Sequence, residues 1–210
     1  MVKQNTMKTK THYLLVLDQS GSMQSSWDST RLAVQSQFES LHATQLEFPE
    51  VPIEVTFVTF ESSYHPHFMS KKTTEIQHLD WGAIYPKELT ALLDAIGRSL
   101  NELSHLVKEE EDVVCMIFTD GGENASKEFS YENIRELIES KKKAGWQFNM
   151  IGADFDAWSE GSKIGLMQEE VYQYKKSEIP KMMQAFSSAF HDYSEEKSSE
   201  PTTRFSKFKF

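Results

Sequence analysis

The sequence predicts an α/β protein whose central sheet is doubly wound, mainly parallel and built from about six strands, with helices on both faces. Two observations predict this fold class. Short apolar runs rich in β-branched and aromatic residues recur along the chain, bounded by Asp, Gly or Asn, which is typical of buried parallel strands. Segments with helical spacing lie between these runs, and strands that alternate with helices favour right-handed βαβ crossovers.

The expected elements follow in chain order. Strands are predicted at residues 13–17, 53–60, 113–118, 148–152 and 171–174. Helical spacing is present from Leu32 to Leu41, from Leu89 to Leu103, from Ile134 to Ile138, in a short stretch ending at Ser159, and at residues 177–193. Residues 62–80 break the alternation. Because Pro66 has no N–H to donate to a central ladder, we expect an antiparallel edge strand or hairpin there.

Length and charge limit the domain organisation and the partners. The 210-residue chain carries 22 Lys and Arg against 32 Asp and Glu, which gives a formal net charge of −10. This acidic balance argues against nucleic acid as a partner, since backbone phosphates are bound by clustered basic residues. We expect one domain at residues 11–193, between a polar extension at residues 1–10 and a flexible tail at residues 194–210.

Other features favour a cytoplasmic location. No run approaches the roughly 20 apolar residues of a membrane-spanning helix, and the polar, basic residues 1–10 do not resemble a secretory signal. We therefore expect no membrane partner. Cys115 is the single cysteine, so no intramolecular disulfide is expected, and its place in an apolar strand indicates an inert core residue.

Polar side chains gather where the predicted parallel strands end. They are Asp18, Ser20 and Ser22 after the first strand, Thr90 where a helix is expected to begin, and Asp120 after the third strand. The carboxyl ends of parallel strands meet at one edge of the sheet, where open α/β proteins bind ligands. Each signal alone also has a structural explanation, namely helix capping for the hydroxyls and an Asp-Gly turn for Asp120.

Together, Asp-x-Ser-x-Ser, Thr-x-Leu-x-x-Ala and Thr-Asp-Gly, in this order, resemble the metal-ion-dependent adhesion site (MIDAS) of the von Willebrand factor type A (VWA) family. The resemblance covers residues 11–192 and implies a Rossmann-like VWA fold. More closely, residues 85–97, 119–126 and 145–154 look like small stand-alone bacterial and phage members.

The resemblance implies a metal site and a use for it. Ser20, Ser22 and Thr90 would supply neutral oxygens, while Asp18 and Asp120 would balance the charge of Mg²⁺, a hard cation that prefers oxygen ligands. Mn²⁺ and Ca²⁺ suit the same oxygens. A protein partner would complete the shell with an Asp or Glu. The expected function is therefore a cytoplasmic, metal-dependent protein-interaction module that is not an enzyme.

Two alternatives stay open. A metal with carboxylates could activate water in a hydrolase or phosphatase-like enzyme, although no His or Lys is placed by motif as general base. Alternatively, the metal of a scaffold protein could serve folding only. Glu88 adds a question about the site itself, because relatives commonly approach the threonine through glycines. Its carboxylate could close the site or compete for the metal, or it could be a solvated residue favoured by the helix dipole.

Several further residues have two interpretations each. His65 and His67 could bind a transition metal or could simply be polar residues of an edge strand. Asp154 and Asp156 could lie at the rim of the site or could cap turns and helices. Trp27 and Trp158 could contact a partner or could pack in the core. The aromatic segment at residues 205–210 is either a docking strand or motif or a disordered end.

Overall fold

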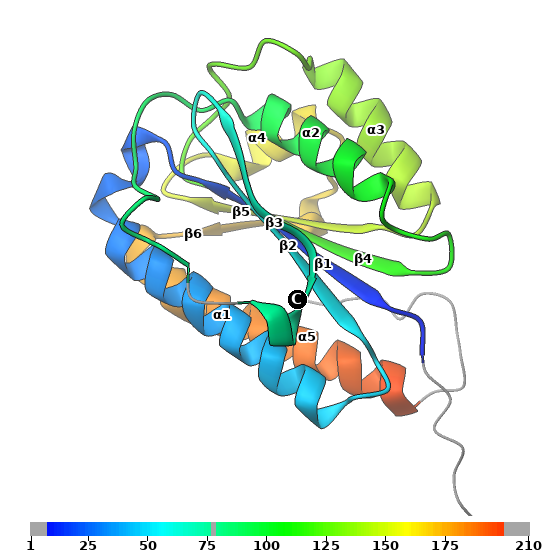
Figure 1. The fold of residues 1–210 in the computed structure, drawn as a ribbon. Coiled ribbons are helices and arrows are strands. Elements are labelled where there is room, and N and C mark those ends of the chain that lie inside the picture. Colours follow the sequence, from blue (N-terminus) through cyan, green and yellow to red (C-terminus); the bar gives the residue numbers. More distant parts are fainter. Residues whose placement is uncertain (1–7, 77–78, 200–210) are drawn as a thin grey trace, which may run out of the picture.

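The computed structural model describes residues 8–76 and 79–199, which fold into a six-stranded sheet with helices on both faces (Figure 1). The strands are β1 (Thr11–Asp18), β2 (Ile53–Phe60), β3 (Tyr64–Lys72), β4 (Asp112–Thr119), β5 (Gln147–Ala153) and β6 (Val171–Tyr174). Their order in the sheet is β3-β2-β1-β4-β5-β6, and in the described part of the chain β3 is the antiparallel strand. The predicted fold class and the antiparallel edge strand are confirmed.

The helices divide between the two faces of the sheet (Figure 1). One face is covered by α1 (Trp27–Glu47) and α5 (Ile179–Ser199), and the other by α2 (Leu92–Ser104), α3 (Tyr131–Lys143) and α4 (Ala157–Lys163). Short 3₁₀ turns are η1 (Gly21–Ser25), η2 (Thr73–Glu75), η3 (Gln168–Glu170) and η4 (Lys176–Glu178). None of the helices in the described ranges is both long and apolar enough to cross a bilayer.

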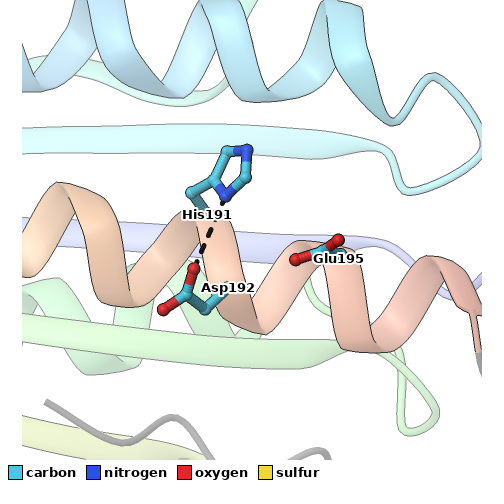
Figure 2. Close-up of side chains that lie close together, drawn as sticks. All are labelled: His191, Asp192 and Glu195. Atoms are coloured by element: carbon cyan, nitrogen blue, oxygen red, sulfur yellow. Dashed lines mark ion pairs between the residues drawn. The ribbon is translucent and has the colours of Figure 1, made fainter.

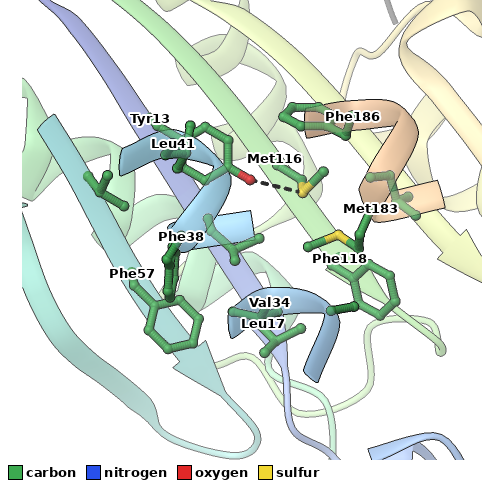
Figure 3. Packing of buried hydrophobic residues seen from close by; sticks show 14 of the residues in the cluster. Tyr13, Leu17, Val34, Phe38, Leu41, Phe57, Met116, Phe118, Met183 and Phe186 are labelled. Carbon is green, nitrogen blue, oxygen red and sulfur yellow. Dashed lines mark hydrogen bonds between the residues drawn. The ribbon is translucent and has the colours of Figure 1, made fainter. Parts of the chain in front are cut away.

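Two hydrophobic cores lie on opposite faces of the sheet because successive side chains of a strand point in opposite directions. Tyr13 and Leu15 of β1 belong to the core under α1 and α5, whereas Leu14 and Val16 belong to the core under α2, α3 and α4. Figure 3 shows the first core, where the Tyr13 hydroxyl donates to the sulfur of Met116 at 3.4 Å. Strands buried on both faces explain the continuous apolar runs in the sequence.

Two leucines of the predicted helical stretches are exposed. Leu32 lies in α1 and is 60 % exposed, whereas Leu89 is 56 % exposed and precedes α2, which begins only at Leu92. The second helix therefore begins later than its apolar spacing predicted. Cys115, by contrast, is buried in β4, and burial raises the pKa of its thiol, as expected for an inert core residue.

The last helix extends beyond its predicted end at Tyr193. It continues to Ser199, and Ser194 and Lys197 are buried. The Lys197 ammonium donates to the Asp112 carboxylate at 2.6 Å, which allows a charged residue to be buried at this end of the sheet. Residues 194–199 are thus part of α5 and not of a flexible tail. The aromatic segment at residues 205–210 lies outside the described residues.

Candidate metal site

The five predicted ligands meet at the carboxyl edge of the sheet, between β1 and β4. The chain passes from β1 to β2 on one side, while β4 pairs with β1 on the other, so the edge between β1 and β4 is a topological switch point. Loops diverge at such a point and leave a crevice in which open α/β sheets bind ligands. The fold therefore places these side chains where a ligand is expected.

Asp18, the last residue of β1, is fully buried at the floor of the site. One of its carboxylate oxygens accepts a hydrogen bond from the backbone N–H of Ser20 at 2.6 Å, and the other accepts from the Thr119 hydroxyl at 2.6 Å. These two bonds hold the carboxylate between the loops that follow β1 and β4. Burial nevertheless raises the pKa of the Asp18 carboxyl to about 6, since the low-dielectric surroundings disfavour its charge.

Ser20, Ser22 and Asp120 form a connected polar group above Asp18. The hydroxyl oxygens of Ser20 and Ser22 are 3.0 Å apart, and the Ser22 hydroxyl donates to Oδ1 of Asp120 at 2.5 Å. Ser20 is buried, whereas Ser22 is exposed, so the group runs from the protein interior to solvent. The predicted Asp-x-Ser-x-Ser and Thr-Asp-Gly segments are in direct contact.

Thr90 joins this group from the loop before α2. A Cβ atom at Gly121 would lie 3.7 Å from the Ser22 hydroxyl oxygen and 3.8 Å from that of Thr90, so both hydroxyls flank the same glycine. The side-chain amide oxygen of Asn124 accepts from the Thr90 N–H at 2.8 Å, and the Asn124 N–H donates to the Thr90 carbonyl at 3.0 Å. Asn124, which the sequence analysis did not single out, thus fixes the Thr90 backbone beside the β4 loop.

Lys176, the first residue of η4, is a second residue that sequence reasoning missed. Its ammonium lies 2.7 Å from Oδ2 of Asp120 and donates to the Ser22 carbonyl at 2.9 Å. This lysine is 56 positions from Asp120 (176 − 120), and no local motif links the two residues. Only the fold, which brings the start of α5 to this edge of the sheet, shows the contact.

The donor set fits a divalent cation. Three hydroxyl oxygens and two carboxylates converge, and hard cations such as Mg²⁺ prefer oxygen ligands. Oδ2 of Asp120 is buried and lies 2.7 Å from the Lys176 ammonium, so this carboxylate oxygen already faces a positive charge.

Glu88 lies beside the site through its backbone. Its φ is 58°, a left-handed conformation that glycine adopts without strain, and its carbonyl accepts from the Gly21 N–H at 3.1 Å. The side chain is exposed, and none of its described contacts joins it to the five predicted ligands. The backbone of Glu88 thus takes the role of a glycine in this loop.

The other candidate residues divide between structural roles and the rim. Asp156 caps α4 by accepting from the Ser159 N–H at 2.9 Å, and Asp154 has a left-handed φ of 61° in the turn after β5. Trp27 is buried and its ring N–H donates to the Ile84 carbonyl at 3.2 Å, so it is a core residue. Trp158 is 42 % exposed and remains a candidate rim residue.

The histidines of β3 are engaged separately. His65 lies 2.7 Å from the Glu61 carboxylate, while His67 lies 2.7 Å from the Thr59 hydroxyl and stacks on Phe57. Burial lowers the pKa of His67 to about 4. These contacts favour the structural interpretation of both histidines over a shared transition-metal site.

A separate group of side chains that could hold a metal lies on α5, where His191, Asp192 and Glu195 come together (Figure 2). Nε2 of His191 is 3.1 Å from a carboxylate oxygen of Glu47 in α1, and Nδ1 is 3.6 Å from one of Asp192. The Glu47 hydrogen bond raises the pKa of His191, and both ring nitrogens already face carboxylates. We therefore interpret the cluster as an ion-pair contact between α1 and α5.

Comparisons with known proteins agree with this geometry. Proximal thread matrix protein 1 from the mussel byssus is 20 % identical, with a TM-score of 0.60 over 86 % of this chain and 46 % of that chain. The vWF domain of the type V pili tip protein Mfa5 from Porphyromonas gingivalis is 9 % identical, with a TM-score of 0.69 over 94 % of this chain and 99 % of that domain. At these identities the likeness shows the fold alone.

One structure of the mussel protein has a zinc-occupied MIDAS motif; it is 18 % identical, with a TM-score of 0.60 over 89 % of this chain and 47 % of that chain. This chain thus spans about half the length of the mussel protein. Among curated protein sequences, none matches the chain. The family model of the von Willebrand factor type A domain, however, matches residues 14–188, a segment that contains all five predicted ligands and all of the sheet except the first three residues of β1. By its fold, by the place of these residues and by this match, the chain belongs to the von Willebrand factor type A domain family.

Proposed function

We propose that the protein is a metal-dependent protein-interaction module, in which Asp18, Ser20, Ser22, Thr90 and Asp120 hold a divalent cation and a partner's carboxylate completes its shell. The observation that carries this proposal is the convergence of three hydroxyls and two buried carboxylates at the switch point of the sheet. Membership of the VWA family supports it.

The charge balance of the site favours an anionic partner. Hydroxyl oxygens are neutral ligands, so a divalent cation held mainly by Ser20, Ser22 and Thr90 keeps much of its positive charge. Asp18 is bound by two protein donors, and Oδ1 of Asp120 accepts from Ser22. A metal in this setting attracts a further carboxylate, and Asp or Glu side chains of a partner are the chemistry that it would recognise.

We propose Mg²⁺ as the ion, since its preferred ligands are carboxylate and hydroxyl oxygens and water. The same oxygens suit Mn²⁺ and Ca²⁺, and the zinc-occupied site of the mussel protein supports a site that accepts more than one divalent metal. Calorimetric titration of the metal-free protein with each ion would rank the affinities.

A non-catalytic role is favoured over hydrolysis. A hydrolase needs a group that takes a proton from water, and in the described part of the chain no histidine makes a hydrogen bond or ion pair with the five ligands. Lys176 is close but is paired with Asp120. Turnover of a generic phosphoester that disappears in Asp120→Ala would contradict this part of the proposal.

Affinity capture from source-cell lysate tests the proposal. Three samples of tagged protein are compared: wild type in Mg²⁺, wild type in EDTA, and Asp120→Ala in Mg²⁺. The fourth sample, Asp192→Asn in Mg²⁺, is the matched control, because this substitution removes an exposed carboxylate of α5 away from the site. We expect a protein retained by wild type and Asp192→Asn in Mg²⁺ only. Equal retention in all four samples would indicate a scaffold whose metal serves folding.

A direct binding measurement with the retained protein separates a metal-bridged partner from a scaffold whose metal serves folding. If the partner's carboxylate binds the metal, its affinity should fall when its exposed Asp and Glu residues near the contact are changed to Asn and Gln. The cytoplasmic location stays a prediction of the sequence, and fractionation of source cells with an antibody to the chain tests it.

A further inference from the structure

Lys176 places a positive charge of the protein on a carboxylate of the metal site. The side chain of Asp120 is fully buried, while that of Lys176 is 24 % exposed and reaches the site from the surface. The ammonium contacts Oδ2 of Asp120, whose Oδ1 accepts from Ser22. Both oxygens of this carboxylate are therefore engaged by the protein, one with a hydroxyl and one with a cation.

The same ammonium also holds the first loop of the site. It donates to the Ser22 carbonyl at 2.9 Å and lies 3.5 Å from the Ser25 hydroxyl, so it joins η1, the loop after β4 and η4. Lys176 begins η4, and α5 starts three residues later at Ile179. The start of α5 is thus connected through one flexible side chain to two of the loops that carry the predicted ligands.

A divalent cation and this ammonium repel each other. Asp18 and Asp120 supply two negative charges and Lys176 one positive charge, so the metal-free site has a net charge of −1. A divalent ion beside Ser22 and Asp120 would put two further positive charges close to the ammonium, next to the fully buried Asp120 side chain. Like charges at such short range repel one another. The lysine side chain is partly exposed, so solvent is open to it when it leaves.

We propose that Lys176 is a built-in cation that competes with the divalent ion for Asp120, and that metal binding releases the start of α5 from the site. This inference rests on the proposed metal site. In the metal-free protein the ammonium neutralises Asp120 and ties η4 to the loops of the site. When the metal binds, the ammonium moves to solvent, and the site and α5 respond to the same event.

Calorimetric titration with Mg²⁺ tests the competition in the full chain. Lys176→Met removes the ammonium, and Lys176→Gln provides a polar second replacement. Lys175→Met is the matched control, because it removes the neighbouring exposed charge, which makes no described side-chain contact with Asp120. We expect both Lys176 variants to bind Mg²⁺ about tenfold more tightly than wild type, and Lys175→Met to stay within about threefold.

Hydrogen exchange of the backbone amides at residues 172–184 tests the release. In wild type, Mg²⁺ is expected to speed exchange in this segment. In Lys176→Met, exchange is already fast in EDTA and does not respond to Mg²⁺. Lys175→Met should behave as wild type. Thermal unfolding in EDTA checks that every variant is folded before it is compared.

The outcomes separate this inference from the proposed function. Equal Mg²⁺ affinities of wild type and the Lys176 variants overturn the competition while leaving the metal site intact. Tighter binding without any change in exchange overturns the release of α5. If Lys176→Met binds Mg²⁺ and wild type does not, the result supports the inference, since the lysine then blocks the site in wild type. If no variant binds Mg²⁺, the metal site fails and the competition is overturned with it.

Discussion

The buried end of α5 provides the sharpest test of the fold. We predict that Lys197→Met destabilises the protein by about 3–5 kcal/mol, because the change leaves a buried carboxylate without its cation. Lys197 is 6 % exposed and Asp112 is 3 % exposed. The ammonium donates to Asp112 at 2.6 Å and to the Thr11 hydroxyl at 2.8 Å. After the substitution Asp112 keeps the Tyr193 hydroxyl, 2.9 Å away, as a neutral donor.

Urea unfolding followed by circular dichroism measures the loss. For a chain of this length each 1 kcal/mol lowers the melting temperature by about 2–4 °C, so thermal unfolding should shift by about 6–20 °C. Lys181→Met is the matched control, since Lys181 is an exposed lysine of the same helix. Its substitution should change the unfolding free energy by no more than about 0.5 kcal/mol.

A double-mutant cycle identifies the cause. Asp112→Asn removes the buried charge, so Lys197→Met combined with Asp112→Asn should be clearly more stable than the sum of the two single losses predicts. A loss below about 1 kcal/mol for Lys197→Met, or strict additivity in the cycle, would refute the reasoning. Residues 194–199 would then not be docked on the sheet.

Three further predictions concern other parts of the molecule. Burial lowers the pKa of His12, so the unfolded chain takes up a proton more readily than the folded state as the pH falls below 6.5. Wild type should therefore lose stability there, by at most about 1.4 kcal/mol per pH unit, and His12→Gln should flatten this slope in urea titrations from pH 5 to 8. Gly152→Ala should cost about 1–3 kcal/mol in the same assay, because the added Cβ overlaps Ala157 and lies 2.7 Å from the Phe155 ring; an unchanged stability would contradict this packing. Glu88→Gln should keep the Mg²⁺ affinity within about fivefold by calorimetry, since its side chain is exposed, and a larger change would show that the carboxylate acts on the metal.

The sheet and the five candidate ligands were predictable because their signals are local or periodic. β1 and β4 are buried along their whole length, and a strand buried on both faces reads as a continuous apolar run. Asp18, Ser20, Ser22 and Asp120 lie at or just after the ends of these strands, so parallel pairing is enough to bring them to one edge, and Thr90 precedes α2 in a motif that the family resemblance identified.

The errors have an equally physical origin. Residues after Tyr193 are mostly Ser, Glu and Lys, a composition that indicates a solvated end, and lysine is almost never fully buried unless it is paired. The partner of Lys197 is Asp112, which is 85 positions earlier in the chain. Lys176 was missed for the same reason, since its partner Asp120 is distant in sequence and the contact depends on how α5 packs against the sheet.

The two lysines give α5 different attachments at its two ends. Lys197 is almost fully buried and is held by Asp112 and Thr11, so water and ions do not reach the pair. Lys176 is 24 % exposed, and its partner Asp120 is one of the residues expected to bind metal. A divalent ion therefore competes with the Lys176–Asp120 ion pair and leaves the Lys197–Asp112 ion pair unchanged. Release at Lys176 then alters the start of α5 while the helix stays anchored at its end. This asymmetry predicts that Lys176→Met changes unfolding in EDTA far less than Lys197→Met does, because solvent screens the partly exposed pair.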